Sequence, residues 1–476
     1  MSWSRYSDQH ADDPLSPFLA GTRHLREPGR ARQRHSAPIP AQGRVSRSVT
    51  SLAGGMRRGV SWAAPKCAYS PRIWVNCSPA TATGRISRVG KAHRARKSCF
   101  WTVRTAPWEV DHNFDARLPD GRRRHLAVSA LRNVAFWTSA TGTALRQSVP
   151  ILLASTWDLT GTRTVFARDA ATGQWLGSAI AHSPPTKDFL PHIRCFGQHR
   201  DAVTGADLVF AGDPSGIFRG AFDLASGSLH WDPVPKVASA ELNIPAAPGI
   251  GDRLRVGAFA EANGVLYVSV GQQIYQRGDG RTPSWRLLYT NPRQHVTETG
   301  LRGMTAVATP TGREMLLAVA EGYQSRIVRI DPADGGEATE LDLDAFLNRA
   351  WGTRVSFVIA AYNDMAPIGG ALLLGMEAFI PPRSPRPPGH TVLDVVHGLE
   401  AGAWYLIRDK AGQYRLCQIE VDFPRIGHSL VSVRAILASP FPGDGAVYFA
   451  GYDANYTPIH DSAWIARATT SVALSE

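Results

Sequence analysis

The sequence has no long apolar run and little cysteine. Nowhere does it reach the ~18 uninterrupted apolar residues that a membrane-spanning helix needs, which excludes an integral helical membrane protein. It has five cysteines among 476 residues, and no two of them have a CxxC or other zinc-ligand spacing. It therefore indicates neither a disulfide framework nor a cysteine-bound metal. Cys195 and Cys417 stand in β-prone runs, where we expect half-buried strand residues.

Familiar catalytic signatures are missing as well. The chain contains no GxxxxGK[ST] phosphate loop, no GxGxxG turn, no HExxH helix, no GxSxG elbow and no EF-hand loop. A P-loop ATPase, a Rossmann dehydrogenase and a zincin protease therefore have no support. His and carboxylate residues spaced for zinc are also absent.

Lysine is rare, with 6 residues against 46 arginines, yet the formal net charge is +12. Taken whole, this charge suggests a nucleic-acid or acidic-membrane partner. Residues 1–110, however, hold 19 Lys+Arg against 5 Asp+Glu, whereas the rest of the chain holds 33 against 35. The basicity belongs to one segment, and the sequence does not favour a nucleic-acid partner for the remainder.

Residues 1–110 show no apolar period of 3.6 or 2 and are rich in Ser, Pro, Gly and Arg. Such a segment cannot bury enough apolar surface to offset its ordering entropy, which predicts a disordered basic extension. Three interpretations stay open: a nucleic-acid arm, a tail without function, or a start site assigned too far upstream. Asp8, Asp12 and Asp13 and the lack of an apolar h-region argue against a secretory signal, which favours the cytoplasm.

From about residue 120 onward the chain repeats. Six strongly β-prone runs begin 57, 58, 50, 56 and 75 residues apart, at Ile151, Leu208, Leu266, Leu316, Leu372 and Val447. A second alternating run follows each of them, and a third, more polar run follows in most units. A further run precedes each unit from the second onward, at 194–196, 256–260, 303–308, 355–361 and 433–438. The pattern is four strands in roughly 50 residues.

This pattern resembles β-propeller repeat proteins, with six recognisable blades and a domain over residues 111–476. The resemblance implies an all-β, six-bladed β-propeller. It carries architecture only, because the WD40, kelch and sialidase signatures are absent. The last unit lacks a fourth strand, and we expect residues 100–103 or 134–137 to complete the ring. If both runs were used, a partial seventh blade would result. The alternative fold is a two-sheet sandwich.

Two departures from the repeat are visible. Residues 341–351 have apolar positions at a helical period and predict a short helix in a loop between blades. Residues 381–402 lengthen the last repeat interval and begin with a proline-rich stretch, which is typical of a stiff, exposed excursion.

Acidic residues recur where the second strand of a unit ends. In a propeller, the loops between strands 2 and 3 and between strands 4 and 1 share one face around the channel mouth. Five of six units carry a carboxylate at this position, namely Asp158, Asp213, Glu321, Glu377 and Asp453, with Gly271 as the exception. Converging carboxylates favour a cation, a basic group or sugar hydroxyls. Alternatively, the acids only mark strand exits and accept bonds from loop amides.

Two loops at the same face contain further side chains that can bind a ligand or transfer a proton. Residues 291–302 contain His295, Glu298 and Arg302, and residues 453–461 contain His460. A His beside a carboxylate can form a general acid–base pair, and Arg302 can clamp a carboxylate or phosphate. Equally, Arg302 can form a structural ion pair with Glu321 or Glu298.

These observations favour a non-catalytic ligand-binding or interaction propeller that uses the acidic channel mouth. Its partner would be a small molecule, a sugar or a protein, and no cofactor is indicated beyond a divalent cation that an acidic mouth would suit. The alternative is a propeller hydrolase or lyase for a carbohydrate-like or lactone substrate. It would use Glu321 and Glu377 as the carboxylate pair, His295 or His460 as proton shuttle and Arg302 as anion clamp.

Overall fold

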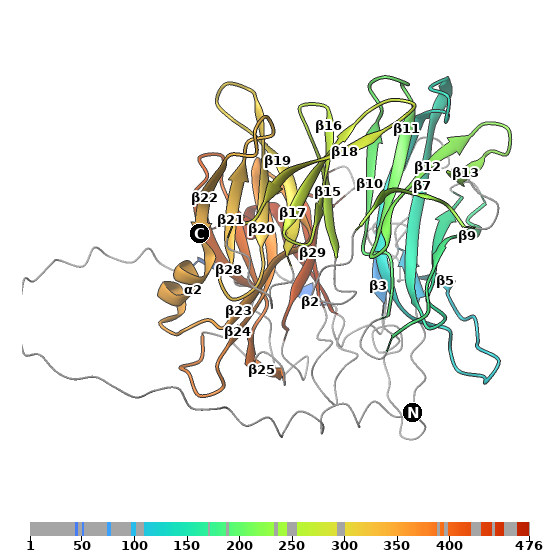
Figure 1. Cartoon of the computed structure of the whole chain (residues 1–476). Helices are drawn as coiled ribbons and strands as arrows, with labels where there is room; N and C mark the ends of the chain where they lie inside the picture. The colour runs from blue at the N-terminus through green and yellow to red at the C-terminus, as the bar shows by residue number, and fades with distance from the viewer. Residues whose placement is uncertain are drawn as a thin grey trace, which may run out of the picture. The chain divides into compact units, whose positions relative to one another are not determined.

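The fold is an all-β, six-bladed β-propeller (Figure 1). The computed structural model describes residues 43–45, 50–51, 74–77, 97–100, 109–169, 172–186, 190–232, 237–244, 255–292, 300–387, 391–394, 398–419, 430–439, 443–451 and 464–475. Most of the expected extension over residues 1–110 lies outside these ranges, so its disorder stays a prediction. Within the described ranges no helix is long and apolar enough to cross a membrane.

Each blade is an antiparallel sheet. Blade 1 is β6 (His125–Thr138), β7 (Ala144–Asp158), β8 (Thr162–Arg168) and β9 (Trp175–His182). Blade 2 is β10 (Cys195–Arg200), β11 (Asp207–Asp213), β12 (Gly216–Asp223) and β13 (Ser228–Trp231), with β14 (Ala240–Asn243) also paired to β12. Blade 3 is β15 (Val256–Ala262), β16 (Val265–Val270), β17 (Gln273–Gly278) and β18 (Ser284–Thr290).

The second half of the chain continues this order. Blade 4 is β19 (Leu301–Ala308), β20 (Glu314–Ala320), β21 (Arg326–Ile330) and β22 (Glu337–Asp342). Blade 5 is β23 (Phe357–Ile368), β24 (Ala371–Ile380), β27 (Trp404–Arg408) and β28 (Tyr414–Ile419). Blade 6 is β29 (Val433–Ala438), β30 (Ala446–Gly451) and β31 (Trp464–Thr469), with β2 (Thr50–Ser51) at its edge. The six runs that revealed the repeat all lie in second strands.

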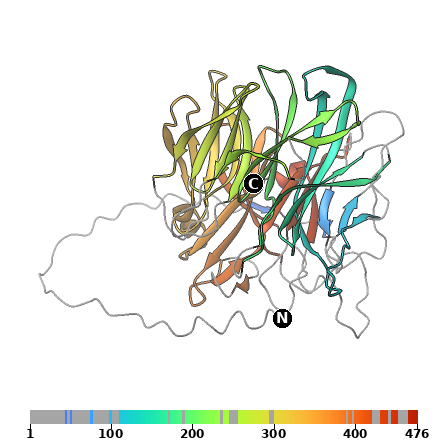
Figure 2. The ribbon, with the colours of Figure 1, turned by 45° about the vertical axis from the view of Figure 1, so that its right-hand side comes forward.

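The first strands of successive blades contact one another in chain order: β6, β10, β15, β19, β23 and β29. In both views the green sheet β10–β13 stands between the teal sheet β6–β9 and the yellow-green sheet β15–β18 (Figures 1 and 2). The first strand is thus the innermost one of each blade. Its close contacts explain its small residues, because a Cβ at Gly257 would overlap the carbonyl oxygen of Leu301 on the next blade.

The hydrophobic core lies between blades. Val134, Phe136 and Leu153 of blade 1, for example, pack against Val209 and Phe218 of blade 2. Similar clusters fill each following blade-to-blade boundary up to that of blades 5 and 6. Because the middle strands of each blade are covered on both faces, their sequences are continuous apolar runs and do not alternate strictly between apolar and polar residues. Each such side chain stabilises the fold by roughly 1.5–3 kcal/mol.

The closure of blade 6 differs from the sequence prediction. Its fourth position is occupied by β2, which pairs antiparallel with β31 through Thr50 and Arg467. Residues 134–137 instead lie in β6, because the buried Val134 and Phe136 are needed as core residues of blade 1. The expectation that one of the two β-prone runs completes the last blade was therefore wrong.

Residue 100 belongs to a separate three-stranded sheet. This sheet consists of β3 (Trp74–Cys77), β4 (Lys97–Phe100) and β5 (Glu109–Asn113), and β3 contacts β6 of blade 1. Phe100 of the first β-prone run thus lies in this sheet, residues 101–103 lie outside the described residues, and the second run lies in β6. A further short strand, β1 (Gly43–Val45), pairs in parallel with β28 of blade 5.

The two departures from the repeat are also present. The helix α2 (Leu343–Trp351) begins after Asp342, whose side chain accepts a hydrogen bond from the Ala345 amide, and it ends at Gly352 with a φ of 64°. It buries Leu343, Leu347 and Trp351 in the core between blades 4 and 5. The insertion forms a hairpin of β25 (Thr391–Asp394) and β26 (Gly398–Ala401) on the end of β24.

Candidate functional site

The structure places four of the five predicted acidic positions at one end of the blades. Asp158 and Asp213 end the second strands of blades 1 and 2, Glu321 follows that of blade 4, and Glu377 lies in that of blade 5. All four are buried. The antiparallel order puts the starts of the innermost strands at this same end, which we call the mouth end. Asp453, His295, Glu298 and His460 lie outside the described residues.

Each of the four carboxylates contacts an arginine. The distances are 2.6 Å from Arg124 Nη2 to Asp158, 2.6 Å from Arg163 Nε to Asp213, 2.8 Å from Arg302 Nε to Glu321 and 2.5 Å from Arg434 Nη2 to Glu377. The pair between Arg302 and Glu321 is the structural alternative that the sequence analysis kept open. Each of these four mouth-end carboxylates is therefore paired with an opposite charge.

Two of these pairs connect neighbouring blades. Arg163 of β8 reaches Asp213 of blade 2, and Arg434 of β29 reaches Glu377 of blade 5. The other two pairs lie within blades 1 and 4. Removing one partner of a buried pair leaves an uncompensated charge, which typically costs ~3–5 kcal/mol. These contacts explain why the carboxylates can be buried at all.

Asp158 shows how such a carboxylate stays charged. Burial alone would raise its pKa, but hydrogen bonds from Arg124 and from the backbone and hydroxyl of Thr160 outweigh burial, so the pKa lies below its ordinary value. The carboxylate can therefore serve as a fixed negative charge at neutral pH.

The mouth end also contains a buried histidine that sequence reasoning missed. His192 precedes β10, its ring lies 4.8 Å from that of Trp157, and its Nδ1 lies 2.8 Å from the carbonyl oxygen of Leu190. Because a carbonyl can only accept, Nδ1 carries the proton, and Nε2 is the acceptor that faces Arg194 Nη1 at 3.4 Å. Burial, and then the positive charges of Arg194, Arg255 and Arg302, lower the pKa of His192 to about 3.

Arg194, Arg255 and Arg302 stand at the starts of three successive innermost strands. The amide of Arg194 donates to Gly212 O at 3.0 Å, and Cys195 Sγ lies 3.9 Å from Val256 O on the next blade. A Cβ at Gly257 would lie 3.3 Å from the carbonyl oxygen of Arg302. The backbones at these three positions are therefore in near contact across the boundaries of blades 2, 3 and 4.

An arginine at the start of the innermost strand is a recurring feature. It occurs in five of the six blades, as Arg124, Arg194, Arg255, Arg302 and Arg434. The sequence carried this signal, since the arginine stands within two residues of the start of each of these five strands. Of these five arginines only Arg302 was expected at this end, because the other residues expected there were carboxylates and histidines.

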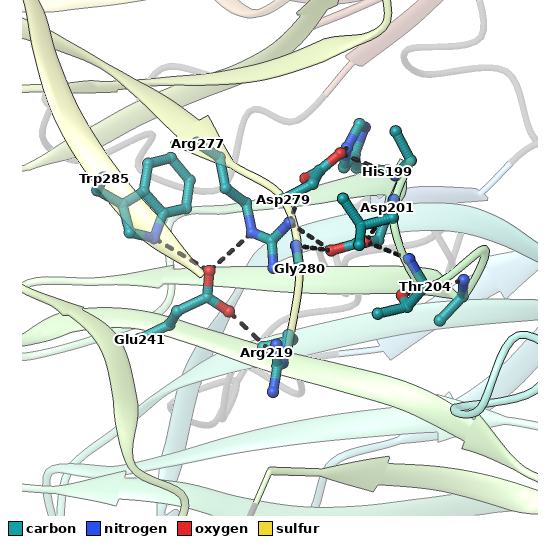
Figure 3. Close-up of polar contacts among 12 residues, drawn as sticks. His199, Asp201, Thr204, Arg219, Glu241, Arg277, Asp279, Gly280 and Trp285 are labelled. Carbon is teal, nitrogen blue, oxygen red and sulfur yellow. Dashed lines mark hydrogen bonds and ion pairs between the residues drawn. The ribbon is translucent and has the colours of Figure 1, made fainter. Parts of the chain in front are cut away.

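The opposite ends of blades 2 and 3 carry a second polar network (Figure 3). The buried Arg277 lies 2.7 Å from Glu241 and 3.0 Å from Asp201, and it also contacts Asp279. His199 bridges Glu261 at 2.9 Å and Asp279 at 3.0 Å. Since these residues lie on β10, β14, β15 and β17 and the turns after them, the network connects blades 2 and 3.

Part of this network repeats elsewhere in the ring. An arginine at the end of a third strand and an aromatic residue at the start of the fourth share one carboxylate from a preceding strand. Figure 3 shows this arrangement for Arg277, Trp285 and Glu241, with Trp285 Nε1 3.1 Å from the carboxylate. We call it the Arg–aromatic–carboxylate clasp. The same clasp is formed by Arg168, Trp175 and Asp111, and by Arg408, Tyr414 and Glu340.

The clasps are structural contacts, because in each of them the arginine and the aromatic residue donate to the same carboxylate of a neighbouring sheet. The carboxylate of the first clasp in the chain, Asp111, comes from β5, so the three-stranded sheet contacts blade 1 as a preceding blade does. No group of three or more His, Cys, Asp or Glu side chains suited to a metal ion occurs in the described part of the chain.

Comparisons with known proteins give no family. No family model matches the chain, and no curated protein matches it. Among solved structures, the extracellular domain of a putative one-component system from B. thetaiotaomicron is 9% identical with a TM-score of 0.40, covering 88% of this chain and 39% of that one. A protein from Lactobacillus plantarum is 10% identical with a TM-score of 0.39, covering 81% and 93%. The Aleuria aurantia lectin in complex with α-methyl-L-fucoside is 10% identical with a TM-score of 0.34, covering 73% and 94%. This chain thus spans about two fifths of the first of these proteins, and none of the three informs its function.

Proposed function

We propose that this protein is a ligand-binding or interaction propeller whose site lies at the mouth end of the blades. The observation that carries the proposal is the recurrence of charged side chains at this end in blade after blade. Replacing a buried ion pair with apolar residues is often neutral or stabilising, so stability alone does not explain a ring of such pairs. Charged groups at the mouth of a channel are suited to recognition of a polar partner.

The predicted residues outside the described ranges belong to this proposal. His295 and Glu298 lie on the connection from β18 to β19, and Asp453 and His460 lie on the connection from β30 to β31. Both connections join strands at the mouth end. We therefore keep these four residues, together with Glu321, Glu377 and Arg302, as the proposed lining of the site, and a small molecule, a sugar or a protein as its partner.

Binding is favoured over the hydrolase or lyase alternative by the arginine contacts. A pair of catalytic carboxylates faces the substrate with ~5–10 Å between them, one of them carrying a proton. Glu321 and Glu377 lie in different blades and each contacts its own arginine at 2.8 Å and 2.5 Å. This is the arrangement of structural ion pairs.

The proposal is tested by a thermal-shift and calorimetry screen of the full chain against neutral sugars, organic acids and divalent cations. A ligand of the mouth should lose affinity in Glu321→Gln or Glu377→Gln. Asp334→Asn is the matched control, because this exposed carboxylate lies in a turn at the opposite end of blade 4. Equal affinity in all three variants would place the site elsewhere, and a screen without any saturable ligand would contradict the proposal.

A further inference from the structure

We propose that the sector of the mouth end formed by Arg194, Arg255 and Arg302 binds the oxyanion of a small molecule, a carboxylate or a phosphate group. This inference rests on the proposed function and names the ligand class of the same site. We call these three residues the arginine sector.

The first argument is the placement of the three backbones. Innermost strands of a propeller adjoin the central channel, and β10, β15 and β19 contact one another in that order. Gly257 allows β15 and β19 to approach at the level of Arg255 and Arg302, because any side chain there would overlap Leu301 O. Three long cationic side chains therefore start from one small area.

The second argument is the charge around His192. Its Nδ1–H donates to Leu190 O, which leaves Nε2 as an acceptor toward Arg194. The imidazole is thus a neutral positioning residue for a guanidinium. Burial is the main cause of its lowered pKa, and the charges of all three arginines lower it further. Three arginines that act on one buried imidazole form a local concentration of positive charge, which suits the recognition of an anion.

The third argument is the donor geometry. A guanidinium presents five N–H donors in a planar fork that matches carboxylate and phosphate oxygens. The bond from Arg302 Nε to Glu321 fixes the orientation of that fork. Trp157, which is partly exposed, adds an aromatic wall beside His192. The chemistry of the sector therefore suits an oxyanion better than a cation or a neutral sugar.

The test is isothermal titration of the full chain at low salt with inorganic phosphate, citrate and glucose as probes. We expect saturable binding of citrate or phosphate, and an affinity lowered about tenfold or more in Arg194→Gln and in Arg255→Gln. Arg146→Gln is the matched control, because this exposed arginine lies on β7 near the opposite end of blade 1. Raising the salt concentration should weaken the anion in the wild type.

Two outcomes overturn the inference: neither anion binds, or both glutamine variants bind the anion as tightly as Arg146→Gln does. If a glutamine variant fails to fold, Arg194→Lys keeps the charge but removes the fork and should bind with intermediate affinity. Glucose binding that is lost in Glu377→Gln, with no anion bound, would contradict the arginine sector but leave the proposed function standing. No saturable ligand of either kind would contradict both.

Discussion

Arg277 on β17 and Glu241 on β14 form a buried ion pair, with Nε 2.7 Å from the carboxylate. The same guanidinium reaches Asp201 in the turn after β10. One side chain thus neutralises carboxylates from two elements of blade 2. This pair holds two blades together through charge at a boundary whose interior is apolar.

Replacing Arg277 should therefore be among the most destabilising single changes in the chain. Arg277→Met removes the compensating charge from Glu241, Asp201 and Asp279 together, and we expect a loss of about 3–5 kcal/mol in the free energy of unfolding. Chemical denaturation measures it. Arg146→Met, at an exposed position, should change stability by less than about 0.5 kcal/mol. A similar small effect for both variants would show that the network does not support the blade boundary.

The clasp of blade 5 predicts a measurable loss of stability when the hydroxyl of Tyr414 is removed. Tyr414→Phe removes the hydrogen bond from its hydroxyl to Glu340 at 2.8 Å and leaves a half-buried carboxylate with one donor fewer. We expect a loss of about 1–3 kcal/mol, seen as a lower Tm. Trp137→Phe serves as control because this side chain is 58% exposed. An unchanged Tm in Tyr414→Phe would mean that Arg408 alone satisfies the carboxylate.

His192 predicts how stability depends on pH. Its folded-state pKa of about 3 lies below the ordinary value of 6.5, so the unfolded chain takes up the proton first as the pH falls. Below about pH 6.5 the protein should therefore lose stability, by up to about 1.4 kcal/mol per pH unit from this residue. His192→Gln should flatten the profile between pH 6.5 and 4 in urea unfolding. The same slope in wild type and variant would assign the loss to other groups.

Gly257 predicts a packing limit between innermost strands. Gly257→Ala places a methyl group against Leu301 O, which is backbone and cannot move without shifting β19. Overpacking of this kind typically costs ~1–3 kcal/mol. Gly336→Ala, in an exposed turn where only the flexible Asp334 side chain is near, is the control. Because Arg302 follows Leu301, the variant should also lower the affinity of the arginine sector for its ligand. An unaltered Tm would show that β15 and β19 can move apart at this point without loss of stability.

Much of the architecture could be read from the sequence because the repeat is expressed in apolar residues. The buried run at Leu208 coincides with β11, and the helical period at residues 341–351 with α2. The closing strand could not be found in this way. Thr50 and Ser51 form a strand of two residues, too short to show any period, and they pair with a segment at the other end of the chain.

Among the charged residues of the site, the sequence indicated the acidic ones and Arg302, but not the other arginines. Glu321 and Glu377 stand near the ends of second strands and can be recognised within a single repeat unit. The contact of Arg434 with Glu377, by contrast, joins two neighbouring blades. Such a contact depends on how neighbouring sheets lie against each other, which a repeat period does not contain. His192 was overlooked for a related reason, since a lone histidine in an apolar loop resembles an ordinary core residue until three arginines are placed around it.

The pairing of β2 with β31 has a kinetic consequence. The four main strands of each of blades 1 to 5 follow one another closely in the chain, so their contacts can form as soon as those strands are available. Blade 5 gains one distant strand, β1, only at its outer edge. Blade 6 needs Thr50 beside Arg467, nearly the whole chain apart. Contacts of such long range form slowly, because closing the long loop between the two segments costs conformational entropy before the contact can stabilise the fold. The last blade should therefore be the final sheet to fold, and until then the edge of β31 is open to strands of other chains.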